Sequence, residues 1–427
     1  MEMKLSKWLL AFIVCLSVSE TKAQDWHAAK DSAKNKTTAG AKEGEWFEFL
    51  DSRGIAAKDS NEAVYYQLTE YKSGKPNGLV MQYLLNGAIE GEIHYTNGIK
   101  NGIEKEYYES GLIRSETPYV NGALNGVVKL YSENGTLLSE TPYTDDRVNG
   151  SLKLYYESGK LSSETPYLND KRNGLEKRYY ENGSLQSETP YIEGKKNGIE
   201  KTYSEESGKL WFETPYTNDV KNGIENEYYY TGILKAESTY TDGMKNGAAK
   251  EYYTNGNVHI VTLYTNDNKN GLSTEYYESG RVKQETPYTD YKTNGVVKIY
   301  FETGELKSEA TYTNDKENGL ETNYYRAGKV QLESPYVNGK KNGIEKNYSE
   351  NGALLMEIPY SNGKESGIEK VYYPNGNIHF EIPYVYGKKD GVEKEYSEKG
   401  KLKSETTYYA GVFKSTQRYD LIGKEKK

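Results

Sequence analysis

The stretch Gly102-Ile-Glu-Lys-Glu-Tyr107-Tyr108-Glu-Ser-Gly111-Leu-Ile113-Arg-Ser-Glu116-Thr-Pro118-Tyr119-Val-Asn-Gly-Ala-Leu-Asn125 decides the fold, because the same pattern starts again at Gly126. The period is 24 residues, and a fixed period of this length is typical of a repeat array. We number each copy from its glycine as position 1. Glycines in this position stand at 78, 102, 126, 150, 174, 198, 223, 247, 271, 295, 319, 343, 367 and 391.

Within a copy, four positions carry the hydrophobic pattern. Position 6 is tyrosine, position 12 is Ile, Leu or Val, position 18 is tyrosine, and position 2 is apolar in every copy but the one with Ser151. All four are even, which is the alternation of a half-buried strand. Glu-Asn-Gly or a similar triplet at positions 8 to 10 supplies a turn between two strands. Each copy is therefore predicted to be one β-hairpin.

The length of the turn sets the register of that hairpin. A three-residue loop places the position-6 tyrosine opposite the position-12 aliphatic, gathers positions 2, 6, 12 and 18 on one face, and sets glutamates at positions 3 and 15 opposite each other. A two-residue loop pairs the position-4 lysine with the position-15 glutamate but divides the apolar set. We favour the first, because burial outweighs surface charge pairs. Proline at position 17, as in Pro118, is expected to end pairing of the second strand.

The predicted fold class is therefore all-β, an elongated single-layer antiparallel sheet of about 14 tandem 24-residue hairpins. Residues 43–77, with Trp46 and Phe49, are expected to form a degenerate N-terminal cap, because terminal repeats must close a sheet edge. Residues 78–414 hold the fourteen copies, and 415–427 form a C-terminal cap or tail. Residues 24–42, rich in Ala, Lys, Thr and Ser, are expected to be a flexible leader.

Residues 1–23 have the features of a secretory signal peptide. Lys4 and Lys7 precede an apolar run from Trp8 to Val18, and cleavage is expected after Ala23. The run is too short to span a membrane. We therefore expect a secreted, periplasmic or cell-envelope protein with weak or no membrane association.

Composition narrows the classes of function. The chain of 427 residues has 55 Lys plus Arg, 63 Asp plus Glu, a net charge of −8, and 44 tyrosines. This mild acidity disfavours nucleic-acid binding, which needs a basic surface. The 35% hydrophobic content suits a thin array rather than one deep core.

The return segments carry a resemblance to a known family. Tyr95-Thr-Asn-Gly-Ile-Lys-Asn-Gly102 and Tyr336-Val-Asn-Gly-Lys-Lys-Asn-Gly343, joined to Tyr-Tyr-Glu-Asn-Gly-x-Leu, resemble the bacterial variant of the MORN repeat, as in the YwqK family of antitoxins. Unlike the classical MORN pattern, Asn121 or Asn338 stands two residues after the tyrosine and glycine follows one later. The resemblance implies consecutive hairpins in one layer and a binding or scaffolding role.

Catalytic constellations are not apparent in the sequence. His259 and His379 occupy the same position of copies five repeats apart, which we estimate at roughly 48 Å from strand spacing, so they are not expected to share a site. Glutamate recurs at position 15 as a row rather than a pair, and a solvated row partly paired with lysine is the simpler interpretation. We therefore expect no enzyme activity, no cofactor and no metal site.

One feature exceeds the needs of folding: a second aromatic row at position 7, on the face opposite the apolar set. Exposed tyrosines offer a large contact area for a partner protein or glycan, although β-propensity alone also favours tyrosine on an exposed strand. Trp211 and Phe212, beside a turn with one extra residue, form a second candidate patch. The aromatic row is Tyr108, Tyr156, Tyr180, Tyr229, Tyr253, Tyr277, Phe301, Tyr325 and Tyr373.

These features predict a secreted, non-enzymatic repeat protein that binds an unidentified protein or cell-envelope component as a ribbon or scaffold. One alternative is carbohydrate binding or adhesion through the aromatic row. The other is an antitoxin-like partner that neutralises a toxin.

Overall fold

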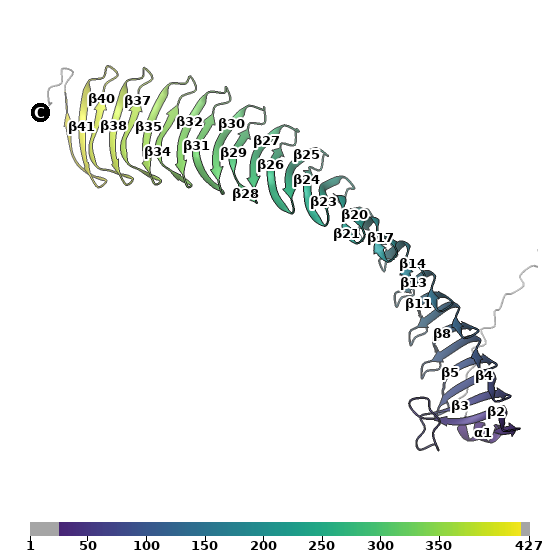
Figure 1. The fold of residues 1–427 in the computed structure, drawn as a ribbon. Helices are drawn as coiled ribbons and strands as arrows, with labels where there is room; N and C mark the ends of the chain where they lie inside the picture. Colours follow the sequence, from purple (N-terminus) through teal and green to yellow (C-terminus); the bar gives the residue numbers. More distant parts are fainter. Residues whose placement is uncertain (1–24, 420–427) are drawn as a thin grey trace, which may run out of the picture. The chain divides into compact units, whose positions relative to one another are not determined.

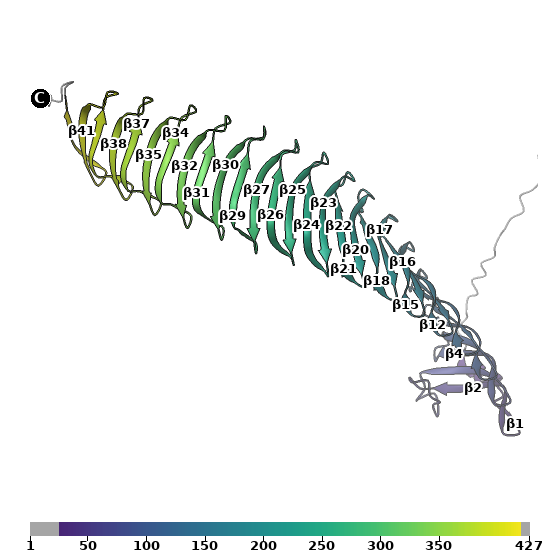
Figure 2. The ribbon, with the colours of Figure 1, turned by 45° about the horizontal axis from the view of Figure 1, so that its top comes forward.

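The computed structural model describes residues 25–419, and these confirm the all-β fold class. Within this range one short helix accompanies a single antiparallel sheet of 42 strands. Contacts divide the chain into an N-terminal unit, Met1–Lys195, and a C-terminal unit, Lys196–Lys427. In each unit consecutive hairpins lie side by side in chain order (Figures 1 and 2).

The first strand of most copies runs from the glycine at position 1 to the tyrosine at position 6. Strands of this kind are β7 (Gly102–Tyr107), β10 (Gly126–Tyr131), β13 (Gly150–Tyr155), β16 (Gly174–Tyr179), β19 (Gly198–Tyr203), β22 (Gly223–Tyr228), β29 (Gly295–Tyr300), β34 (Gly343–Tyr348), β37 (Gly367–Tyr372) and β40 (Gly391–Tyr396). Four first strands are longer: β4 (Lys75–Leu84), β24 (Met244–Tyr252), β26 (Asn268–Tyr276) and β31 (Lys316–Tyr324).

The second strand of each copy starts at the position-12 aliphatic and ends one residue after the position-18 tyrosine. These strands are β5 (Ile89–Thr96), β8 (Ile113–Val120), β11 (Leu137–Thr144), β14 (Leu161–Leu168), β17 (Leu185–Ile192), β20 (Leu210–Thr217), β23 (Leu234–Thr241), β25 (Val258–Thr265), β27 (Val282–Thr289), β30 (Leu306–Thr313), β32 (Val330–Val337), β35 (Leu354–Ser361), β38 (Ile378–Val385) and β41 (Leu402–Tyr409).

The return segment between the second strand of one copy and the first strand of the next is a second tight hairpin. In the copy quoted above, Asn121 and Gly122 have φ of 50° and 86°, so two left-handed residues reverse the chain as in a type I′ turn. Val120 then pairs with Ala123 across the turn. Two-residue strands of this kind are β6 (Ile99–Lys100), β9 (Ala123–Leu124), β12 (Arg147–Val148), β15 (Lys171–Arg172), β18 (Lys195–Lys196), β21 (Val220–Lys221), β28 (Lys292–Thr293), β33 (Lys340–Lys341), β36 (Lys364–Glu365) and β39 (Lys388–Lys389).

Proline at position 17 acts on one side of its strand only, which corrects the expectation that pairing ends there. Pro118 still lies opposite Ile103 within its own hairpin. Where position 17 is Thr239, Leu263 or Thr311, the following first strand (β24, β26 or β31) is unbroken, whereas after proline it is split in two. A missing N–H thus accompanies nine interruptions of the ladder to the next copy, while the split between β6 and β7, which follows His94 at position 17, has another cause.

A bulge resolves the choice between the two registers, because the hairpin uses both. Tyr107 pairs with Ile113 next to the turn, as predicted, but Glu106 then pairs with Ser115 and Lys105 with Glu116. Position 13 is therefore an extra residue in the second strand, and beyond it the register is the one that pairs lysine with glutamate. The expected opposition of glutamates at positions 3 and 15 is wrong, and position 18 lies on the other face from position 6.

The N-terminal cap contains more structure than its composition indicated. Residues 24–42, predicted as a flexible leader, include α1 (Trp26–Ser32) and β1 (Lys36–Thr38), followed by β2 (Ala41–Leu50) and β3 (Tyr65–Lys72). Asp25 caps the helix by accepting a hydrogen bond from the backbone of His27 at 3.0 Å. Apolar side chains of α1 and of β2 to β5 form a shared core in this unit.

At the other end, β42 (Val412–Arg418) pairs with β41 and is the last strand of the described residues. The predicted signal peptide and the charged tail Lys424–Lys427 lie outside the described residues. Among residues 25–419, the structure has no helix with the length and apolar character of a membrane span.

Candidate functional site

Side chains of each copy divide between two faces that the register defines. Face A carries positions 2, 4, 6, 12, 15 and 17, and face B carries positions 3, 5, 7, 13, 14, 16 and 18. Residues alternate between the faces along a strand, and the bulge places both positions 13 and 14 opposite position 5. The two faces differ in how well their apolar side chains are covered.

Face A exposes a periodic aliphatic row. Eleven position-2 side chains are 42–54% exposed, and most lie directly opposite a position-17 proline. Scattered exposed aliphatics are ordinary on a protein surface, but a contiguous set is typical of an interaction surface. We call this set the aliphatic–proline row: Ile103, Val127, Leu175, Ile199, Ile224, Leu272, Val296, Leu320, Ile344, Ile368 and Val392, with Pro118, Pro142, Pro166, Pro190, Pro215, Pro287, Pro335, Pro359 and Pro383.

A charged row runs beside it on the same face. Each position-15 glutamate lies between the position-4 residues of its own copy and of the next, as when Glu237 pairs with Lys250 and their side chains meet at 3.1 Å. The same glutamate accepts a hydrogen bond from the next position-6 hydroxyl, Tyr252 to Glu237 at 2.8 Å. Glutamate at position 15 thus joins neighbouring copies, a role that the sequence analysis missed.

These contacts change proton affinities in a regular way. Burial, and then the hydrogen bond to glutamate, raise the pKa of position-6 tyrosines such as Tyr252 and Tyr300 to about 12. The hydrogen bond from Tyr228 lowers the pKa of Glu213. Both shifts favour a neutral phenol bound to an ionised carboxylate, so the charged row keeps its alternating signs at neutral pH.

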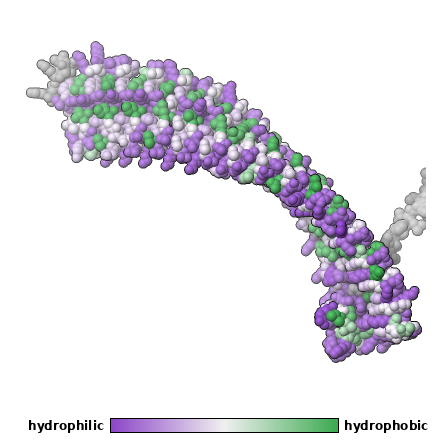
Figure 3. All heavy atoms as spheres, viewed as in Figure 1, coloured by the Kyte–Doolittle hydropathy of each residue, from purple (hydrophilic) through white to green (hydrophobic). Residues whose placement is uncertain are grey.

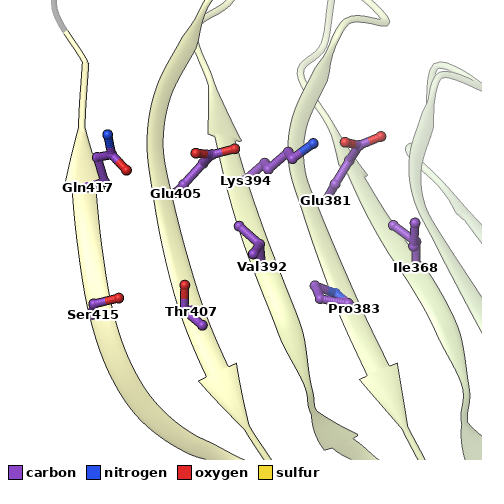
Figure 4. A pocket seen from close by; sticks show the side chains of 9 residues that line it. All are labelled: Ile368, Glu381, Pro383, Val392, Lys394, Glu405, Thr407, Ser415 and Gln417. Atoms are coloured by element: carbon purple, nitrogen blue, oxygen red, sulfur yellow. The ribbon is translucent and has the colours of Figure 1, made fainter. Parts of the chain in front are cut away.

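Near the C-terminal end the two rows border a shallow cavity of about 600 Å³. Figure 4 shows Ile368, Pro383 and Val392 on its apolar side and Glu381 and Lys394 on its charged side, all from adjacent strands. The cavity is open and its lining repeats the pattern of the other copies. It therefore shows face A in detail rather than a separate site.

A stripe of hydrophobic residues is also visible on the surface. In Figure 3 hydrophobic residues of the C-terminal unit gather along the direction in which the hairpins follow one another, with hydrophilic residues on both sides. Such a stripe offers a partner many equivalent contacts in sequence, each made by one copy.

Face B is packed by polar and aromatic groups. Position-18 tyrosines stack under the position-23 cation of the preceding copy, as Tyr119 does under Lys100 at 4.8 Å. The same lysine reaches the position-3 carboxylate of Glu104 at 2.7 Å. Serine or threonine at position 16 bonds the position-3 glutamate of the next copy, as Ser334 does to Glu345 at 2.6 Å. Consequently most buried polar residues of the array lie on face B.

The predicted aromatic row lies on face B, and its hydroxyl groups are engaged. All nine side chains are half-buried. The hydroxyl of Tyr277 donates to the backbone carbonyl of Tyr300 at 2.8 Å, and the same bond from position 7 to the next position 6 recurs along the array. Further copies of it link Tyr108 to Tyr131, Tyr156 to Tyr179, Tyr229 to Tyr252, Tyr253 to Tyr276, Tyr325 to Tyr348 and Tyr373 to Tyr396.

The structure brings the second candidate patch together. Trp211 is the extra residue of its bulge and is 50% exposed, and its ring lies 5.2 Å from that of Phe212. His259 and His379 lie in separate hairpins, where each ring contacts the position-7 tyrosine of its own copy. Among residues 25–419, no group of three or more His, Cys, Asp or Glu side chains is arranged to hold a metal ion.

Comparisons with known proteins give one strong match. The family described as the MORN repeat variant matches twelve segments that follow the 24-residue period. No curated protein matches the chain. The segments are residues 100–121, 124–145, 148–169, 172–193, 221–242, 245–266, 269–290, 293–314, 317–338, 341–362, 365–386 and 389–408.

Solved structures resemble the chain only weakly. "Crystal Structure of TcdB2-TccC3" is 13% identical, with a TM-score of 0.15 and coverage of 90% of this chain and 29% of that chain. "Structure of Photorhabdus luminescens Tc holotoxin pore, Mutation TccC3-D651A" is 13% identical, with a TM-score of 0.16 and coverage of 84% and 20%. The chain thus spans less than a third of these proteins, and TM-scores this low carry no argument.

Proposed function

Because the chain belongs to the MORN repeat variant family, we propose that it is a secreted, non-enzymatic repeat protein that binds a partner protein through face A. The observation that carries the proposal is the aliphatic–proline row, whose eleven aliphatic side chains remain 42–54% exposed at one position of successive copies. Folding does not account for this exposure, since hydrophobic side chains gain free energy from burial.

The charged row supports the same proposal. The Lys and Glu side chains lie between the aliphatic–proline row and the row of positions 6 and 12, so a partner bound on the aliphatic–proline row has a polar border along one side, as in many protein interfaces. Many of the position-15 glutamates already accept a hydrogen bond from a position-6 hydroxyl, as Glu237 and Glu285 do, so the charged row contributes to specificity more than to affinity. The catalytic alternative has no comparable support, because the carboxylates repeat along the array rather than converge on one point.

The test is capture of partners from the envelope and secreted fractions of the producing cell, with quantitative mass spectrometry. One variant replaces four row residues by threonine, which is β-branched and has a high strand propensity but carries a hydroxyl. The matched control replaces four exposed apolar residues of face B by threonine. The row residues are Val127, Leu175, Ile199 and Ile344, at 42–51% exposure, and the control residues are Leu130, Leu154, Trp211 and Leu355, at 36–50%.

A partner retained by the control and lost from the row variant is the expected result. Equal retention by both variants would contradict binding through face A. Circular dichroism of both variants checks that strand content is unchanged. Secretion itself is tested separately, by N-terminal sequencing of the exported protein, for which we expect cleavage after Ala23.

Two narrower functions stay as predictions with their own tests. Carbohydrate binding through the position-7 row predicts that a Tyr253, Tyr277 and Phe301 to Ser variant loses signal on a glycan array. Serine also removes the bonds that two of these residues make between copies, so a Tyr253→Phe and Tyr277→Phe variant, which keeps the rings, is the necessary control. The antitoxin-like function predicts rescue of growth when the chain is co-expressed with a toxin encoded beside it.

A further inference from the structure

Helix α1 of this chain packs against face A and shows what kind of ligand this face can bind. Helix α1 shares a core with the sheet of the N-terminal unit, where Ala29 and Ala33 are 0% and 9% exposed. Trp26 packs edge-on against Phe49, with ring centroids 5.3 Å apart. The helix lies beside β2 and β3 in Figure 1.

The residues beneath this helix belong to rows that continue along the whole array. Tyr83 and Ile89 are the position-6 and position-12 residues of the first copy, and they are 6% and 7% exposed. In every later copy the residues at these two positions are only half-buried. The difference between the first copy and the others is the helix, because Tyr83 and Ile89 share its core.

The covered and uncovered parts of these rows are continuous. Tyr66 stacks on Tyr83 at 5.0 Å, and Tyr107, the next position-6 residue, packs against the edge of the same core while remaining half-buried. From Tyr107 onward, no element among the described residues lies over positions 6 and 12. The surface that α1 recognises therefore extends beyond α1.

We propose that the position-6 and position-12 rows of the later copies bind an amphipathic α-helix of a partner protein. This inference rests on the proposed function and specifies its partner. The helix presents one large aromatic residue and one small residue at spacing i and i+3, as Trp26 and Ala29 do on one face of α1, followed by a second small residue at its C-cap, as Ala33 is. Small residues let the helix backbone approach the tyrosine rings closely, and the aromatic residue supplies most of the buried area.

Charges on the partner helix find complements on face A. The position-4 lysines and position-15 glutamates lie beside the tyrosines. A positive or a negative side chain at the edge of the partner helix can therefore pair with an oppositely charged side chain of the same hairpin. In α1 the one basic residue of the last turn, Lys30, lies over the ring of Phe49 at 5.7 Å. A partner helix with this composition is amphipathic rather than uniformly hydrophobic.

The experiment uses the full chain and a defined probe. The probe is a helix-constrained peptide with the sequence Asp25–Lys34 and a photoreactive side chain in place of Lys30. The control peptide carries Ala29→Glu and Ala33→Glu, which put two carboxylates on the face that contacts the sheet. Burying a charge without a partner is costly, so we expect about tenfold or greater loss of cross-linking with the control. Mass spectrometry then locates the cross-links.

Cross-links at positions 6 and 12 of copies from Gly126 onward are the expected result. Cross-links on face B, equal cross-linking by both peptides, or no cross-linking would each overturn the inference. So would cross-links confined to Phe49, Tyr66 and Tyr83, since these would show exchange with α1. If the full chain formed dimers and the peptide dissociated them, the position-6 and position-12 rows would instead be the contact surface for a second copy of this chain. Failure of the peptide, combined with partner capture that depends on the aliphatic–proline row, would leave the proposed function intact.

Discussion

The hydrogen bond from position 7 to the next copy gives a prediction with a natural control. Tyr277→Phe removes one neutral O–H···O=C bond of 2.8 Å at a half-buried site and keeps the ring. Such a bond contributes about 1 kcal/mol, so the free energy of opening the copy that begins at Gly295 should fall by about that amount. A loss of this size corresponds to about fivefold faster amide exchange when opening is at equilibrium.

Phe301 provides the reverse substitution, because it occupies position 7 without a hydroxyl. Phe301→Tyr places a hydroxyl where the other copies donate to the next position-6 carbonyl, here that of Tyr324. We expect slower exchange in the copy that begins at Gly319, by a factor similar to the loss at Tyr277. The assay is native-state hydrogen exchange with mass spectrometry, which resolves single copies.

The pair of variants also tests the physical reasoning. Unchanged amide exchange in Tyr277→Phe would refute a structural role for the hydroxyl. Ligand binding would then be the better explanation of the position-7 aromatic row. Faster exchange in every copy, rather than in the neighbouring one, would contradict the expectation that the stability of a repeat array is a sum of local terms.

Three further predictions concern the backbone and titratable groups. Gly126→Ala should destabilise more than Gly247→Ala in urea unfolding, because the added Cβ would lie 2.8 Å from Pro118 in the first and 3.4 Å from its nearest neighbour in the second, while both glycines have positive φ. Burial, and then the charge of Glu365, raise the pKa of Glu369, so this carboxyl costs stability as pH rises above its ordinary value of 4.5. Glu365→Lys restores the ion pair of other copies and should stabilise at pH 7 but not at pH 4, as urea unfolding at both pH values would show. Position-6 tyrosines with pKa raised to about 12 hold their protons more tightly when folded, so stability should fall between pH 10 and 12, with phenolate absorbance rising at unfolding.

Much of the repeat could be predicted because several signals agree. The period, the two strands, the turn and the pairing of Tyr107 with Ile113 all follow from alternation and from glycine in the turn, and the structure confirms them. The bulge could not be predicted in this way. The bulge adds one residue to the second strand. The charged pair of positions 4 and 15 indicated one register and the apolar pair of positions 6 and 12 indicated another. The structure contains both pairs.

The faces were mispredicted for the same reason. One extra residue moves every later side chain of the second strand to the opposite face, so Tyr119 joins face B. Position-2 aliphatics were predicted to lie on a half-buried face, and their exposure of 42–54% arises because a single layer leaves face A open wherever α1 is absent. The helix was missed because residues 24–42 contain few large apolar side chains and no sustained period, although Ala and Lys favour a helix and Trp26 and Ala29 already show the i, i+3 spacing.

The nearest-neighbour bonding described above has a mechanical consequence. Backbone hydrogen bonds join each hairpin only to the one before and the one after, among the described strands. Tension applied between the two ends of the array would break the backbone hydrogen bonds between neighbouring hairpins in turn. Each hairpin should therefore detach separately and at low force. One detached copy releases 24 residues, a gain in length of roughly 80 Å at full extension. A protein anchored at one end and bound at the other would therefore lengthen in discrete steps under load without losing its remaining contacts.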